Sequence, residues 1–172
     1  ATVAAAFYPG PVYIRFGREK SPVWTTKDTP FKIGQAEIFW SPSASSGRKA
    51  DVAIIGCGML LHNALVAAEE LAKEGVEAMV VNNHTIKPID EKTIIKAAKE
   101  TGAVVTVEEH QVNGGLGSAV AEVLAKNHPV PQEFIGVQDR FGESGEPWEL
   151  VEKFGMGVKD IKEAVKKVIK RK

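Results

Sequence analysis

The segment from 103 to 124 constrains the fold more than any other part of the sequence, because it combines a strand, a loop and a helix. Residues 103–107 are all apolar or β-branched, which is typical of a buried strand. A polar turn is expected at 108–111, and the glycine-rich stretch 113–115 follows it. Apolar residues then recur at helical spacing from 116 to 124. This order places the loop at the carboxyl end of the strand, where open α/β sheets usually have their sites.

The same alternation of strands and helices extends over most of the chain. Short apolar runs predict the other strands, and amphipathic stretches ended by glycine predict the helices. We expect strands at 36–40, 52–55, 78–81 and 133–137, a serine-rich loop at 41–47, and helices at 59–73, 91–99, 147–154 and 158–169. Such alternation favours parallel strands covered on both faces. The expected fold class is therefore α/β, a three-layer αβα sandwich on a mostly parallel five-stranded sheet.

Residues 1–30 have a different pattern. The first seven residues are typical of the last turns of a helix, which Pro9-Gly10-Pro11 would stop. The run 12–16 (VYIRF) predicts a strand, and residues 23–34 predict an extended linker. Because the chain starts without Met in an alanine-rich helix end, we expect residues 1–30 to be the remnant of a neighbouring domain, with apolar side chains left partly exposed. Residues 31–172 would then form the second domain.

Composition and charge exclude several classes of function. The 22 Lys and Arg residues balance the 22 Asp and Glu residues, so no overall field favours nucleic acid or an acidic membrane. No apolar run approaches the roughly 20 residues that span a bilayer, and the start lacks the basic flank and apolar core of a signal peptide. The single cysteine, Cys57, excludes an internal disulfide and favours a cytoplasmic location.

Two glycine-bearing turns could hold an anion. Gly56 and Gly58 follow a strand, as in dinucleotide-binding turns, but the third glycine position holds Leu61. The next strand also lacks an acidic residue at its end, so a plain tight turn is the favoured interpretation. Gly114 and Gly115 open a helix whose first amides could hold an anion. No Lys or Arg stands nearby in sequence, and close approach of two backbones is the structural alternative.

Several side chains could carry chemistry but favour a structural interpretation. The Glu108-Glu109-His110 stretch could supply a proton-transfer pair or a metal site, yet neighbouring residues of an extended chain point to opposite sides. A hydrogen-bonded loop at a domain or subunit contact is favoured instead. Cys57 follows a buried strand and is interpreted as an inert thiol, although a nearby helix start could lower its pKa. His84 stands alone in a loop and is interpreted as structural.

Arg15 and Arg18 stand at the end of the strand predicted at 12–16. A guanidinium group suits phosphate oxygens, and the carboxyl end of a strand is a suitable place for such a contact. Alternation along the strand separates Arg15 from Phe16, so one arginine could instead pack or form an ion pair. The basic cluster at 166–172 complements the helix dipole and is interpreted as a solvated helix end.

Several longer stretches match one known family in order and over essentially the whole chain. They are GPVYIRFGR, FKIGQAEIF, DVAIIGCG, ALVAAEELAKEGVEAMVVN, IKPIDEKTI, VEEHQVNGGLGSAVAE and DRFGESGEPWELVEKFGM. The chain resembles the C-terminal part of transketolases, and the sixth stretch and the end of the seventh are the most specific. Deoxyxylulose-phosphate synthases and 2-oxoacid dehydrogenase β subunits share the fold with weaker versions of these motifs, and they are the alternatives within this resemblance.

This resemblance implies part of a transferase of the pentose phosphate pathway that moves a two-carbon ketol unit between sugar phosphates. Family members use thiamine diphosphate and a divalent metal, held between a diphosphate-binding and a pyrimidine-binding domain. The family's Gly-Asp-Gly motif is absent from this chain, so Asn82-Asn83 does not belong to it. We therefore expect no catalytic, cofactor-binding or metal-binding residue here, and no turnover by this chain alone.

One family function matches residues of this chain. An arginine that closes the last strand of the pyrimidine-binding domain contacts the sugar phosphate, and it matches Arg18 best, with Arg15 as the alternative. Gly17-Arg18-Glu19 differs from the commoner Ser-Arg-(Gln/Pro) of the family. The resemblance also assigns residues 1–30 to the end of the pyrimidine-binding domain and residues 31–172 to the transketolase C-terminal domain.

The expected partners are the remaining transketolase domains or subunit, a second copy in a homodimer, and sugar phosphates in the full enzyme. Nucleic acid and membranes are not expected partners. The C-terminal domain would supply packing contacts, and the turns with Gly56, Gly58, Gly114 and Gly115 are candidates for a regulatory anion site. A stand-alone module that binds an anion or a nucleotide is the alternative from a different functional class.

Overall fold

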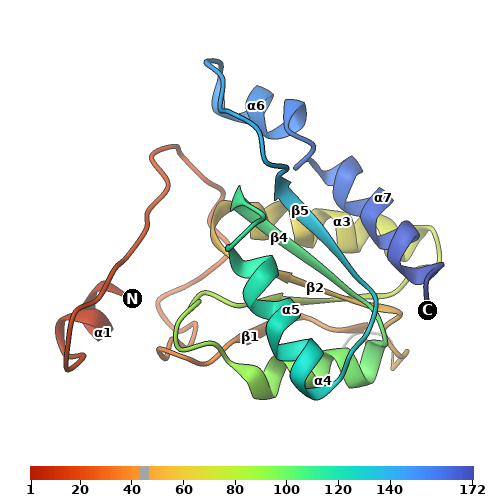
Figure 1. Ribbon diagram of the computed structural model, residues 1–172, viewed down its shortest axis with the longest axis horizontal. Helices are drawn as coiled ribbons and strands as arrows, with labels where there is room; N and C mark the ends of the chain where they lie inside the picture. Colours follow the sequence, from red (N-terminus) through yellow and green to blue (C-terminus); the bar gives the residue numbers. More distant parts are fainter. Residues whose placement is uncertain (43–46) are drawn as a thin grey trace.

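A five-stranded sheet forms the middle layer of the molecule, with the strand order β1-β3-β2-β4-β5 (Figure 1). The parallel strands are β2 (Val52–Gly56), β3 (Ala78–Asn82), β4 (Val104–Gln111) and β5 (Gln132–Val137), and β1 (Glu37–Trp40) pairs antiparallel with β3 at one edge. The computed structural model describes residues 1–42 and 47–172. The predicted fold class is confirmed, while most of the loop expected at 41–47 lies outside the described residues.

Helices cover both faces of the sheet. The helices α3 (Leu61–Lys73), α6 (Pro147–Lys153) and α7 (Val158–Ile169) pack on one face, and α4 (Glu91–Thr101) and α5 (Leu116–Asn127) pack on the other. Along β2, Val52 and Ile54 enter the first core, whereas Ala53 and Ile55 enter the second. All four side chains are buried, which explains why this strand is continuously apolar rather than alternating.

Local signals account for the ends of most helices. The Asp90 carboxylate accepts a hydrogen bond from the Thr93 amide at 3.1 Å and caps α4, and Gly102 ends it in the left-handed region at φ 71°. The helix expected from 59 begins instead with a 3-10 turn, η1 (Gly58–Leu60), before α3. At the amino end α1 (Thr2–Ala6) is a short helix, as predicted. None of the helices in the described ranges is long and apolar enough to cross a membrane.

The polar stretch at 108–111 belongs to a strand, so the prediction of a turn there was wrong. β4 continues past the end of β2 because β5 runs alongside it, and Gln111 still pairs with Val137. The register shifts between Val107 and Gln111, which marks a bulge-like irregularity. The polar residues of this strand become partly exposed after Glu108, which is itself buried.

The strand predicted at 12–16 is absent from the structure. This segment is extended but pairs with no other strand of the described chain, and its side chains Tyr13 and Phe16 are 87% and 71% exposed. A strand pattern becomes a strand only when another strand completes its hydrogen bonds. The predicted linker at 23–34 is confirmed as a stretch without helix or strand.

The pairing of β5 with β4 turns alternate backbone groups of β5 toward the edge of the sheet. The Val104 amide donates to the Pro131 carbonyl at 3.0 Å, and Val104 lies opposite Gln132. In a parallel ladder this register directs the carbonyls of Gln132, Phe134 and Gly136 away from β4. These three groups would be free acceptors for a strand of another molecule.

Side chains of the same chain bind all three of these outward carbonyls. Arg171 donates to the Gln132 carbonyl at 3.0 Å, and the Gln138 amide donates to the Phe134 and Gly136 carbonyls at 3.1 and 3.2 Å. The carboxyl-terminal end of the chain and the residue after β5 therefore cover this edge and disfavour strand addition.

We predict that Gln138→Leu increases self-association through β5, because it frees two outward carbonyls and adds apolar surface. Light scattering over a concentration series should show larger particles for this variant than for the unchanged protein. Gln35→Leu places the same side chain at another exposed position and is the matched control. Equal scattering by the two variants would show that Gln138 does not protect the edge.

Candidate functional site

The carboxyl edge of the sheet is the place where the candidate residues meet. β2 ends at Gly56 next to β4, and the segment that precedes β1 crosses this edge. Arg15 reaches the Glu109 carbonyl at 2.7 Å, and the Trp24 ring stacks on His62 of α3 with 6.1 Å between ring centroids. A surface groove there is lined by Lys20, Ser21, Pro22, His62, Asn63 and Trp148. Residues far apart in sequence are thus brought together at one edge.

The buried Glu108 carboxylate caps the start of α5. Its two oxygens accept hydrogen bonds from the amides of Leu116 at 2.7 Å and Gly117 at 2.8 Å, and the residue is only 3% exposed. The Gly114 amide donates to the Ser118 hydroxyl at 2.9 Å. Since these amides already have partners, an external anion would have to displace Glu108. The geometry therefore supports a structural role for the turn at Gly114 and Gly115.

Glycine is required where the carboxylate meets the helix. A Cβ on Gly115 would lie 2.2 Å from a Glu108 carboxylate oxygen and 2.7 Å from the Gln111 carbonyl oxygen. A Cβ on Gly117 would lie 2.6 Å from the Phe134 ring and 2.8 Å from the Thr106 hydroxyl oxygen. The Gln111 carbonyl distance supports close approach of two backbones, the structural alternative for this turn, and the other three distances show that side chains also fill the space.

The turn at Gly56 and Gly58 is also filled by the chain itself. The Cys57 amide donates to the Val107 carbonyl at 3.2 Å, and the Gly56 carbonyl accepts from the Asn83 amide at 2.8 Å. Gly58 adopts φ 66°, which glycine accommodates without strain. These contacts support the interpretation of a tight structural turn.

Burial raises the pKa of the Cys57 thiol to about 12, the nearby Glu108 charge adds to this rise, and the Arg15 charge opposes it. The thiol is therefore protonated at neutral pH and is a poor nucleophile. This supports its interpretation as an inert side chain.

The two candidate arginines have different surroundings. The Arg15 guanidinium is bound to the Glu109 carbonyl and so fastens the amino-terminal segment to β4. Arg18 is exposed and makes no hydrogen bond or ion pair to the residues that the structure describes. Of these two arginines, Arg18 has the guanidinium that is available for a ligand.

His84 and His110 lie in different surroundings. His110 contacts the Gln111 carbonyl at 2.7 Å, and its distance to the Glu108 carboxylate is 3.9 Å. His84 stacks on Phe31 with 4.4 Å between ring centroids, and burial lowers the pKa of this imidazole. No group of three or more His, Cys, Asp or Glu side chains among the described residues could hold a metal ion.

The stacked pairs Trp24–His62 and Phe31–His84 were missed from the sequence. Both join the linker to the sheet domain, and each pairs residues at least 38 positions apart. Local spacing contains no signal for such contacts. The linker has no helical or strand periodicity, yet it contains aromatic residues. Their presence is the one feature of the sequence that suggests packing against another part of the chain.

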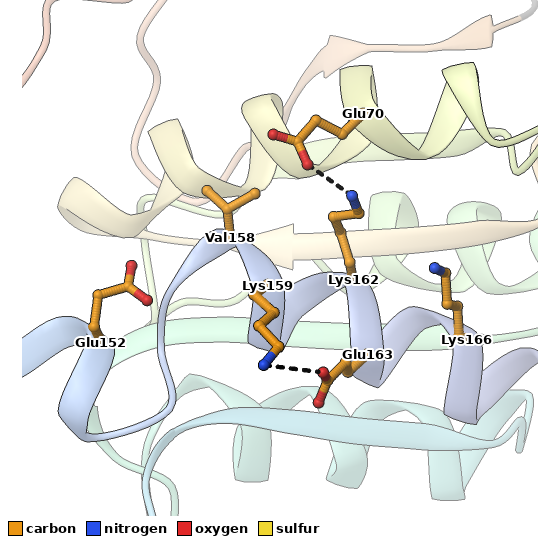
Figure 2. A pocket seen from close by; sticks show the side chains of 7 residues that line it. All are labelled: Glu70, Glu152, Val158, Lys159, Lys162, Glu163 and Lys166. Carbon is orange, nitrogen blue, oxygen red and sulfur yellow. Dashed lines mark hydrogen bonds and ion pairs between the residues drawn. The ribbon is translucent and has the colours of Figure 1, made fainter.

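A second groove lies between α3 and α7, and Figure 2 shows that charged side chains line it. Lys162 forms ion pairs with Glu70 at 2.7 Å and with Glu74 at 2.8 Å, and Lys166 also reaches Glu74 at 2.6 Å. Hydrogen bonds from Lys162 and then from Lys166 lower the pKa of the Glu74 carboxyl to about 2. This network joins two helices, and the Lys162 and Lys166 cations are already paired.

Comparison with known proteins decides the family. The model of the family described as transketolase, C-terminal domain matches residues 45–161. The chain belongs to this transketolase C-terminal domain family. One curated relative is the 6-deoxy-6-sulfo-D-fructose transketolase subunit of Clostridium sp. strain MSTE9, 43% identical over 100% of this chain and 53% of that protein.

Two further proteins that match this chain are also described as transketolases. A solved structure described as a split gene transketolase, inactive beta4 tetramer, has a TM-score of 0.90 and 43% identity, and it covers 98% of this chain and 53% of that one. Human transketolase is 34% identical over 98% of this chain and 26% of its own length. The chain thus spans about half the length of these subunit relatives and about a quarter of the human enzyme.

We predict that Glu108→Gln destabilises this transketolase domain by about 1–3 kcal/mol, because a neutral amide replaces a buried carboxylate that accepts two hydrogen bonds. Chemical denaturation should show this as a lower midpoint with an unchanged slope. Glu109→Gln removes the neighbouring charge, which accepts no such bonds from the residues that the structure describes, and is the matched control. Equal midpoints for both variants would contradict a special role for Glu108.

We also predict a pH-dependent contribution from the ion pairs between α3 and α7. Since the pKa of Glu74 is about 2 in the folded protein, against 4.5 ordinarily, its stabilising effect is present above pH 4.5 and is lost as the pH falls toward 2. Lys162→Met should lower the melting temperature at pH 7 by roughly 2–4 °C, and the difference should shrink on acidification. The control is Lys159→Met, whose single pair with Glu163 is 3.9 Å long. A difference that does not change with pH would contradict the assignment.

Proposed function

We propose that this chain is the C-terminal part of a transketolase that moves a two-carbon ketol unit between sugar phosphates. The observation that carries the proposal is the match of the whole chain, at 43% identity, to a transketolase subunit of which it covers about half. The alternatives within the fold, a deoxyxylulose-phosphate synthase or a 2-oxoacid dehydrogenase β subunit, have less support, because the relatives described above are transketolases.

Thiamine diphosphate and its divalent metal would be held by the part of the enzyme that this chain does not contain. When bound, the thiamine supplies the carbanion chemistry of ketol transfer. The residues present here do not fit the cofactor: the amides of Leu116 and Gly117 are occupied by Glu108, and the Gly-Asp-Gly motif is absent. The chain alone would therefore be non-catalytic.

Residues 1–30 are proposed to complete the pyrimidine-binding domain, and residues 31–172 are proposed to form the C-terminal domain. The exposure of Tyr13 and Phe16 supports this division, because side chains of a strand sequence would be covered once the rest of that domain is present. The aromatic stacks at Trp24 and Phe31 join the linker to the sheet and would fix the relative position of the two domains.

Arg18 is proposed to bind the phosphate of the sugar, and Arg15 is proposed to position it. The Arg15 bond to the Glu109 carbonyl fixes the extended segment three residues before Arg18. The free Arg18 guanidinium could then form paired hydrogen bonds with two phosphate oxygens. Binding the remote phosphate would stabilise the bound substrate and the transition state alike, and so lower the KM.

A sulfonated sugar is a second candidate substrate. The Clostridium relative is named for 6-deoxy-6-sulfo-D-fructose, a sugar that ends in a sulfonate. A guanidinium group binds the oxygens of either anion, so Arg18 suits both. Parallel assays with fructose 6-phosphate and 6-deoxy-6-sulfofructose would identify the preferred donor.

The complete enzyme is proposed to be a cytoplasmic homodimer of the pentose phosphate pathway, in which this chain contributes packing contacts. The tetramer formed by the related split-gene protein supports association between copies of such subunits. A regulatory anion at the turns of Gly56 and Gly114 has less support, because their backbone groups are already bonded within the chain.

We predict that Arg18→Ala, introduced into the complete enzyme, raises the KM for the phosphorylated sugar roughly 10- to 100-fold, the value of one lost charged hydrogen-bonding group. The kcat should change less, because the cofactor site is untouched. Steady-state kinetics would measure both constants, and Lys20→Ala removes a neighbouring exposed cation as a control. An unchanged KM after Arg18→Ala would remove the assignment.

A further inference from the structure

Phe141 is the most exposed large apolar side chain of the described chain, at 97%. It lies in the loop 139–146 between β5 and α6, which projects from the upper end of the molecule in Figure 1. A fully exposed phenylalanine places a large apolar surface in water. Single exposed apolar side chains are common on protein surfaces, so the feature that distinguishes Phe141 is the way its loop is held.

Contacts at the start of the loop hold Phe141 in a defined position. Asp139 and Gln111 exchange two hydrogen bonds: the Asp139 amide donates to the Gln111 side chain at 3.0 Å, and that side chain donates back at 3.2 Å. Asp139 adopts φ 47°, an uncommon conformation for a residue other than glycine. Such backbone strain persists only where surrounding contacts enforce it.

Contacts on the other side of Phe141 fix the remainder of the loop. The Arg140 guanidinium lies 4.2 Å from the centre of the Phe154 ring and also pairs with Glu143 at 2.9 Å. Glu143 in turn pairs with Lys153 of α6. Asp139, Arg140 and Glu143 are therefore anchored while the Phe141 ring is almost fully in water, so the loop backbone loses little further conformational entropy when a partner covers the ring.

The loop that carries Phe141 leads into α6, and α6 lies next to the amino-terminal segment. Trp148 of α6 lines one groove together with Lys20, Ser21 and Pro22. The same amino-terminal segment exposes Phe7, Tyr13 and Phe16 at 85%, 87% and 71%. Exposed aromatic side chains thus occur both on the loop before α6 and on the segment that meets α6.

We propose that Phe141 is an anchor for the other half of the subunit, the part of its subunit relatives that this chain does not match. The inference rests on the proposed function, and the occupant follows from length: the chain covers 53% of the Clostridium subunit. The partner would offer an apolar pocket, since buried aromatic anchors at the centre of an interface contribute most of its binding energy. Arg140 and Glu143 would remain at the rim.

The test labels Phe141→Cys with a maleimide in the complete enzyme. The native Cys57 is half-buried and its raised pKa keeps it protonated at neutral pH, so it reacts slowly, and peptide mapping separates its label from that of the new thiol. Each labelling rate is divided by the rate in guanidinium-unfolded protein. The expected result is at least about tenfold protection relative to Lys126→Cys, a position on α5 whose side chain is 73% exposed. Equal rates at both positions would overturn the proposal.

A second measurement identifies the partner and tests the energetic role. A maleimide photo-crosslinker on Phe141→Cys should capture a peptide of the other half, and capture of residues 1–172 from a second copy would overturn the assignment.

Phe141→Ala should weaken assembly of the complete enzyme about 30-fold, whereas Phe141→Leu should retain most of that assembly. The control is Ile38→Ala, at the opposite edge of the sheet and 40% exposed. Assembly that Phe141→Ala leaves unchanged would also overturn the proposal.

The activity of the unchanged enzyme separates the anchor from the proposed function. If the unchanged complete enzyme lacks ketol transfer, the proposed function fails, whatever the labelling shows. If that enzyme is active and Phe141→Cys is labelled as fast as Lys126→Cys, the proposed function stands and the anchor is wrong.

Discussion

The bond between the Glu108 carboxylate and the first amides of α5 is the interaction on which the carboxyl edge of the sheet depends. A buried carboxylate is costly unless donors surround it, and here two backbone amides and the positive end of a helix stabilise it. The helix end, in turn, has its otherwise unpaired donors satisfied. Gly115 and Gly117 are the residues that leave room for this arrangement, so strand, turn and helix are specified together.

This internal carboxylate changes what the edge can do. In many open α/β sheets the amides at the start of a helix bind a phosphate of the ligand. Here the chain supplies its own anion, and the same charge adds to the burial that keeps Cys57 protonated. Of the two candidate arginines, Arg15 is bound at this edge, and both come from the amino-terminal segment rather than from the sheet domain. The edge therefore serves as a platform that holds the amino-terminal segment through the bond between Arg15 and the Glu109 carbonyl.

The sequence correctly predicted the helices and strands that local periodicity specifies. The prediction was wrong where pairing with a strand distant in sequence determines the structure. The five strands of the sheet and the helices that cover it carry continuous or amphipathic apolar patterns, and the Asp90 cap is a local signal. The stretch 108–111 has the composition of a turn, yet pairing with β5 keeps it in a strand. The run 12–16 has the composition of a strand, yet no neighbour in the described chain pairs with it. Sequence identified Glu108, Arg15 and Arg18 as candidates, but only the fold distinguished the internal cap, the tether and the free guanidinium.

Two other surfaces of the domain already have their polar groups paired. The outward carbonyls of β5 are bound by Arg171 and Gln138, so this side does not invite strand addition. Lys162 and Lys166, between α3 and α7, are paired with Glu70 and Glu74, so that groove is not a strong site for an acidic partner. Aromatic side chains on the loop before α6 and on the amino-terminal segment are left in water. Because apolar burial drives association and paired charges contribute little, a partner gains most by covering these aromatic side chains.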